Sequence, residues 1–143
     1  MNSPLFSWVR ILGRIAAPAI LVAIWVLSLL PGETVAQTGW IAIMGDKAAH
    51  ALAYAAFACS MICAMAKDDM QTSFKEIVQV HRYRILIVIG TVIVLGSGAE
   101  VIQPLFSRGF EFLDIVADTL GGLVGIVLGL SVITAVRLVE RRS

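Results

Sequence analysis

Charged residues are scarce in this chain. Only 15% of its 143 residues are Asp, Glu, Lys or Arg, whereas 59% are hydrophobic and the mean hydropathy is +0.90. This composition excludes an ordinary soluble domain and indicates an integral membrane protein. The net charge is only +1 and no long basic block is present, so the sequence gives no support for nucleic-acid binding.

Cysteine is also scarce. Cys59 and Cys63 are the two cysteines, four residues apart in an apolar stretch. They are too few and too isolated to indicate a metal-binding motif or a secreted disulfide framework, and ordinary helix packing accounts for them. The chain also has no internal repeat or low-complexity tract, so we interpret residues 1–143 as one domain.

Four uncharged runs divide the chain, at residues 15–32, 48–66, 85–99 and 119–136. A spanning helix needs roughly 20 mainly apolar residues. The third run would extend only about 22 Å at ~1.5 Å per residue, so its helix should continue past Glu100 towards Gln103. The sequence therefore predicts an all-α fold of four transmembrane helices, near residues 12–31, 47–66, 84–104 and 113–137.

A short amphipathic segment is expected between the second and third helices. Met70, Phe74, Ile77 and Val78 recur there at helical spacing, while charged residues occupy the other faces. That pattern is typical of a helix lying on the inner leaflet of the membrane.

The distribution of Lys and Arg predicts the orientation, because cytoplasmic segments are enriched in both residues. Nine of the eleven lie on the N-terminus, the loop between helices two and three, or the C-terminus, and only Lys47 and Arg108 lie on the other two loops. Both termini are therefore expected in the cytoplasm of a bacterial cell, with segments 33–47 and 104–114 on the extracytoplasmic face of the cytoplasmic membrane.

A secretory signal is a second interpretation of the N-terminus. Arg10 and Arg14 precede an apolar run, and small residues near Ala36 could form a cleavage point. The run is longer than the ~7–15 residues of a signal core, which favours a retained helix.

A first group of polar residues lies at the expected outer end of the second helix. Asp46, His50 and Tyr54 follow at steps of four, which places them on one side of a helix, and Lys47 lies beside them. Asp46 could cap the helix N-terminus, and His50 could bond between helices. A purely structural role therefore also explains this group.

A second group lies around the third connection. Glu100 and Gln103 are three apart at the end of the third helix, Pro104 ends or kinks that helix, and Arg108 lies in the following turn. Charged groups at this depth are costly, which indicates a functional site.

Asp114 and Asp118 continue this group onto the fourth helix. They are four apart, and the same face continues with Gly121, Gly125 and Gly129. Small residues at this spacing let another helix approach closely, so both carboxylates should face a neighbouring helix rather than lipid.

Together these residues resemble the VanZ-like family of small bacterial membrane proteins. The similar segments are Asp46-Lys47-Ala-Ala-His50-Ala-Leu-Ala-Tyr54, Glu100-Val-Ile-Gln103 with Arg108, and Asp114-Ile-Val-Ala-Asp118 followed by Gly121 and Gly125. The likeness runs from about Asp46 to Gly129. Asp118 departs from it, because the family usually has asparagine at that position.

The resemblance implies a role at the cell envelope. The family takes its name from low-level resistance to the glycopeptide teicoplanin, and its members occur beside envelope and exopolysaccharide machinery. Membrane lipids and envelope assembly proteins are therefore the partners to expect.

Several functions are compatible with this site. In a binding or accessory protein, the site would hold a lipid-linked or phospholipid-type head group through Lys47 and Arg108, with the remaining polar residues lining it. In a hydrolase or transferase acting on a lipid phosphate, His50, oriented by Asp46, or Glu100 would act as acid or base, and a divalent cation could bridge phosphate to the carboxylates. A structural ion-pair network and a proton-coupled transporter are also compatible with these residues. The candidate site residues are His50 and Glu100 for catalysis, and Asp46, Lys47, Tyr54, Gln103, Arg108, Asp114 and Asp118 for binding.

Overall fold

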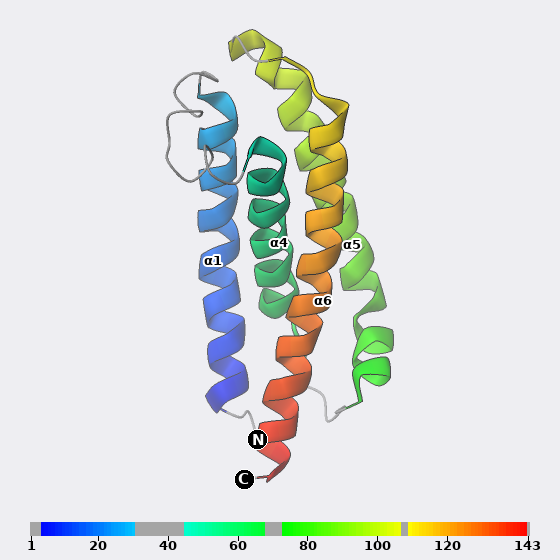
Figure 1. Cartoon of the computed structure of the whole chain (residues 1–143). Coiled ribbons are helices and arrows are strands. Elements are labelled where there is room, and N and C mark those ends of the chain that lie inside the picture. Colours follow the sequence, from blue (N-terminus) through cyan, green and yellow to red (C-terminus); the bar gives the residue numbers. More distant parts are fainter. Residues whose placement is uncertain (1–3, 31–44, 68–72, 107–108, 143) are drawn as a thin grey trace.

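The chain folds into four long helices. The computed structural model describes residues 4–30, 45–67, 73–106 and 109–142. Its elements are α1 (Pro4–Leu29), α4 (Asp46–Ala64), α5 (Phe74–Ile102), the short 3₁₀ turn η1 (Gln103–Phe106) and α6 (Phe112–Arg142), as Figure 1 shows. No strand occurs in the described part of the chain. The predicted all-α architecture of four helices is confirmed.

All four helices are long and apolar enough to cross a membrane. Large apolar side chains remain exposed on their outer surfaces, among them Leu86 on α5 and Val124 on α6. Exposed side chains of this kind suit contact with lipid rather than with water. The protein is therefore a multi-pass membrane protein.

Helices α1 and α6 extend beyond their predicted spans. α1 begins at Pro4 and α6 continues to Arg142. Proline suits the first turn of a helix because its fixed φ is helical and its missing N–H needs no partner there. Arginines interrupt neither helix, because their long side chains can carry the charge away from apolar surroundings.

The predicted amphipathic segment is continuous with α5. The helix begins at Phe74, so Ile77 and Val78 belong to its first turns, and Ile77 is fully buried. Met70 lies outside the described residues. The apolar face of this segment therefore packs partly inside the bundle.

The helices pack around α4. It lies against α1 and α6, and α6 also packs against α5 (Figure 1). Glycines make the contact between α4 and α6 close: a Cβ added at Gly121 would collide with the carbonyl of Ala51, and one at Gly125 with the carbonyl of Ala55. The predicted close approach at the glycine face is confirmed, and its partner is α4.

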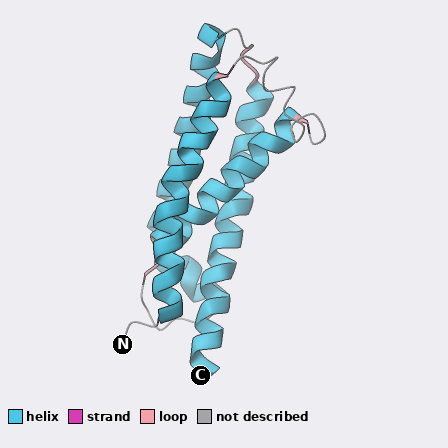
Figure 2. Cartoon of the chain, turned by 90° about the vertical axis from the view of Figure 1, so that its left-hand side faces the viewer, coloured by secondary structure: helices cyan, strands magenta, loops and turns pink. Residues whose placement is uncertain are grey.

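Different helix ends form the two ends of the bundle. Figure 2 shows the start of α1 and the end of α6 at the same end of the bundle. The opposite end is formed where α4 begins, α5 ends and α6 begins (Figure 1). An apolar core that includes Phe57, Ile62 and Val92 separates them.

Candidate functional site

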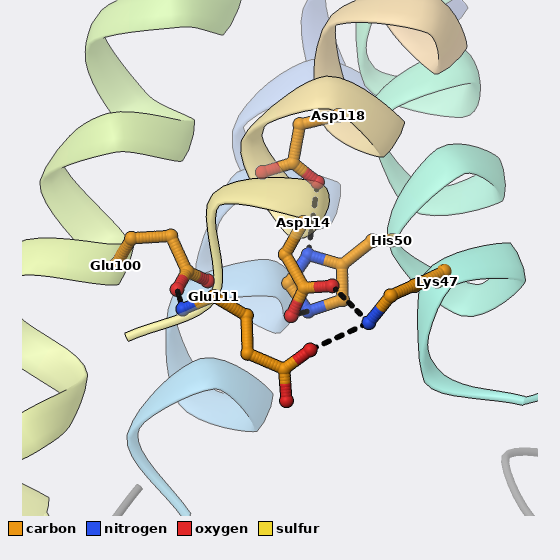
Figure 3. Close-up of polar contacts among 6 residues, drawn as sticks. All are labelled: Lys47, His50, Glu100, Glu111, Asp114 and Asp118. Atoms are coloured by element: carbon orange, nitrogen blue, oxygen red, sulfur yellow. Dashed lines mark hydrogen bonds and ion pairs between the residues drawn. The ribbon is translucent and has the colours of Figure 1, made fainter. Parts of the chain in front are cut away.

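A polar cluster occupies the end of the bundle opposite the chain termini. It contains side chains from the first turns of α4, the last turn of α5 and the start of α6, which the antiparallel course of these helices brings together (Figure 3). We define the acidic cluster as Asp46, Lys47, His50, Tyr54, Glu100, Gln103, Glu111, Asp114 and Asp118.

Lys47 joins α4 to the start of α6. Its Nζ lies 2.6 Å from Glu111 Oε2 and 3.1 Å from Asp114 Oδ1. Asp114 is almost fully buried, whereas Lys47 and Glu111 remain about half exposed. Lys47 therefore already has two carboxylate partners and is not a free cation for a phosphate group.

His50 lies between the two aspartates of α6. Its Nδ1 is 2.9 Å from Asp118 Oδ1, and its Nε2 is 3.8 Å from Asp114 Oδ2 (Figure 3). The shorter contact is a hydrogen bond, which fixes the ring orientation. Asp118 is thus a carboxylate that orients His50, a role that the sequence predicted for Asp46.

Asp46 differs from its predicted capping role. Gly45, and not Asp46, occupies the N-cap position of α4, with a φ of 80° that favours glycine. Asp46 is the first residue of the helix. A carboxylate there still interacts favourably with the helix dipole.

Glu100 enters the cluster from α5. Its side chain is fully buried, and its Oε2 accepts a 2.8 Å hydrogen bond from the backbone N–H of Glu111. Figure 3 shows the carboxylate directed towards Asp114 and His50. The predicted continuation of the third helix past Glu100 places the residue inside the bundle, since α5 runs to Ile102.

Four buried polar side chains of the cluster have an atom without a hydrogen-bond partner. These atoms are Tyr54 Oη, Glu100 Oε1, Gln103 Nε2 and Asp118 Oδ2. All four residues are almost completely buried. Buried polar groups are normally paired, so unpaired ones call for a functional or structural explanation. Together these four atoms offer hydrogen-bonding positions that a ligand could use.

Asp118 also packs tightly against α5. A Cβ added at Gly96 would lie 2.7 Å from Asp118 Oδ2, so a larger residue there would require the Asp118 side chain to shift. The small residue therefore positions Asp118 between α5 and His50.

Negative charge dominates the described cluster. Its carboxylates come from five residues, whereas Lys47 is its only lysine or arginine and His50 can supply one further positive charge. Several carboxylates in a poorly solvated place require compensation by protons or cations. The cluster is therefore suited to a positively charged ligand.

Three residues of the cluster could hold a metal ion. Asp46, His50 and Asp114 each offer one ligand atom, and these atoms all lie within 4.8 Å of one another. Because Nδ1 of His50 faces Asp118, its Nε2 is the atom directed towards Asp114. Imidazole held by a carboxylate at its other nitrogen is a common arrangement in metal sites.

The structure brings together all but one of the predicted site residues. Arg108 lies outside the described residues, so its position is not assigned. Glu111 is an additional cluster member, and its place three residues before Asp114 was the sequence signal that it belongs to the same helix end.

The fold and the cluster define the class of the protein, a four-helix multi-pass membrane protein with an acidic cluster at one end. Comparisons with protein-family models, with curated proteins and with solved structures found no match.

Proposed function

We propose that this chain is a VanZ-like membrane protein whose acidic cluster binds the head group of an envelope lipid. The observation that carries the proposal is the set of buried, unpartnered polar atoms in a site with excess negative charge. Binding requires complementary charge and free bonding positions, whereas no nucleophile is needed. The role is therefore recognition, in support of envelope or exopolysaccharide assembly or of glycopeptide sensitivity.

The charge of the cluster favours an amino group as the part of the head group that is recognised. An ammonium group offers N–H donors that the free oxygens of Glu100 and Asp118 can accept. Lys47 is engaged by Glu111 and Asp114, which leaves Arg108 as the residue we propose for the phosphate.

The proposed location is the extracytoplasmic side of the bacterial cytoplasmic membrane. The acidic cluster lies opposite the chain termini, and Lys and Arg are concentrated at the end with the termini. The positive-inside rule then assigns the termini to the cytoplasm.

Thermal unfolding of the purified protein in detergent tests this function. Phosphatidylethanolamine should raise the melting temperature, whereas phosphatidylcholine should not, because its trimethylated nitrogen has no N–H to donate. Glu100→Gln and Asp118→Asn should each reduce the shift. Glu76→Gln is the matched control, since Glu76 is an exposed carboxylate at the other end of α5. Equal shifts with both lipids, or in the site variants and the control, would contradict the proposal.

Catalysis on a lipid phosphate is the second candidate function. It is favoured by the 2.9 Å contact between His50 and Asp118, which orients the imidazole as a general acid or base needs. A divalent cation between Asp46, His50 and Asp114 could bridge to the phosphate. If the protein is such an enzyme, His50→Ala would abolish head-group turnover while phosphatidylethanolamine still bound. If it only binds the lipid, no turnover would be detected with the unaltered protein.

A further inference from the structure

A basic pocket lies near the other end of the bundle, away from the acidic cluster. It has a volume of about 680 Å³ and lies between α1, the end of α4 and α5. We define the basic pocket by its four cations, Arg10, Arg14, Lys67 and Arg84. The remaining lining residues are Ala64, Met65 and Ala66, so no carboxylate lines it among the described residues.

A close helix crossing brings two of the arginines to the pocket. Gly13 on α1 lies against α4, where an added Cβ would be 2.7 Å from the carbonyl oxygen of Ser60. Arg10 and Arg14 flank this glycine and are four residues apart, so they share one side of α1. The contact at Gly13 therefore sets both guanidinium groups beside the end of α4.

Backbone hydrogen bonds fix the chain segment that forms another wall of the pocket. The Lys67 N–H donates to His81 Nε2 at 3.1 Å, and the Lys67 carbonyl accepts from Arg137 Nη2 at 3.3 Å. Both partners are buried side chains from other helices. These bonds to α5 and α6 hold the turn after α4 in place, so the fold itself positions this wall of the basic pocket.

The positive charges of the pocket are not neutralised within the described part of the chain. None of the four cations forms an ion pair with a described carboxylate, and Arg10 Nε is buried without a hydrogen-bond partner. Asp68 and Asp69, which follow Lys67, lie outside the described residues. Several guanidinium groups converging on one pocket suit a phosphate, which they can bind through paired N–H donors.

We propose that the basic pocket binds the phosphate of an anionic phospholipid. A lipid is favoured over a soluble anion because exposed apolar side chains lie on the same helices beside the cations, including Ile11, Ile15 and Ile87. Such a surface can contact acyl chains while the arginines hold the head group. Basic pockets between transmembrane helices are a known way of recognising anionic lipids on the cytoplasmic side.

Native mass spectrometry of the full-length protein in detergent tests this site. The unaltered protein should retain one phosphatidylglycerol and bind it at least about tenfold more tightly than phosphatidylcholine. The double substitution Arg10→Gln/Arg84→Gln should weaken phosphatidylglycerol binding by about tenfold or more. Arg14→Gln alone should give a smaller loss in the same direction and serves if the double variant does not fold.

A matched control removes the same amount of charge from the same end of the bundle. Arg82 and Arg142 are exposed arginines outside the pocket, and Arg82→Gln/Arg142→Gln should leave binding unchanged. Equal weakening in the control would overturn the site, because it would show only general charge attraction. Tight binding of soluble glycerol phosphate would overturn the choice of a lipid as the ligand. Phosphatidylethanolamine binding at the acidic cluster is a separate readout, so the two proposals can fail independently.

Discussion

Buried polar groups have different partners at the two ends of the bundle. At the end with the chain termini, the Arg137 guanidinium donates to the Lys67 carbonyl and to Glu140, and it stacks on the ring of Phe6 at 3.6 Å. His81 bonds to the Ile77 carbonyl and accepts from the Lys67 N–H. This network joins α1, α5 and α6 to the segment that follows α4, and the Arg137 guanidinium has three partners in it.

At the opposite end, the buried groups are only partly matched. Glu100 and Asp118 each use one oxygen in a hydrogen bond and leave the other without a partner. Tyr54 and Gln103 each leave a buried polar atom unpaired as well. A set of such atoms costs stability, and the ligand binding that we propose would offset that cost.

A buried charge is therefore not by itself a sign of function. Arg137 contacts α1, α6 and the segment after α4, as expected of a structural clamp. In the acidic cluster, four different side chains each leave a buried polar atom without a hydrogen bond. Substitutions at the two ends should therefore separate stability from binding.

The largest loss of stability is expected when Arg137 is substituted. Arg137→Met keeps much of the side-chain volume but leaves Glu140 and the Lys67 carbonyl without this donor. The free energy of unfolding should fall by about 3 kcal/mol. Denaturant unfolding in detergent, followed by circular dichroism, measures the change. Arg142→Gln, at an exposed position, should show no comparable loss, and a stable Arg137→Met protein would refute the clamp.

A smaller loss of stability is expected when Lys47 is substituted. This residue forms two ion pairs in the acidic cluster. Lys47→Met removes both and leaves the buried Asp114 without its lysine partner. Stability should decrease less than in Arg137→Met, because Lys47 is half exposed and solvent screens its charge. The same unfolding experiment shows which of the two variants loses more stability. A loss as large as at Arg137 would mean that the two ends are equally structural.

The smallest effect on stability is expected at Tyr54. Its hydroxyl is buried and unpartnered, so Tyr54→Phe removes a polar atom without breaking a hydrogen bond. The free energy of unfolding should stay within about 0.5 kcal/mol of the original or rise slightly. Thermal unfolding with and without phosphatidylethanolamine should then show a reduced lipid effect on an equally stable protein. A marked loss of stability would indicate that the hydroxyl has a structural partner.

The sequence predicted the helices and the meeting of the polar residues for clear physical reasons. Apolar runs must be helical in a bilayer, which determined the four spans. The glycine face of α6 indicated a close neighbour, and this placed Asp114 and Asp118 inside the bundle. Alternating helix directions then brought both to the ends of α4 and α5 that carry His50 and Glu100.

The pairing of individual side chains could not be predicted in the same way. Spacing of four placed Asp46 and His50 on one face of α4, but the rotation of α6 against that face decides that Asp118 is the residue that bonds to His50. The contacts of Arg137 were equally hidden, because the predicted orientation of the chain already explains an arginine at this helix end. Only the packed structure shows which of these charges is buried.

The stability of Glu100→Gln in detergent without added lipid tests the central claim most directly. Glutamine keeps an oxygen for the Glu111 N–H and removes the charge of a fully buried side chain. If the acidic cluster exists to bind a ligand, the variant should be as stable as the original protein or more stable. A loss of more than about 2 kcal/mol would contradict this account and show that the carboxylate holds the bundle together.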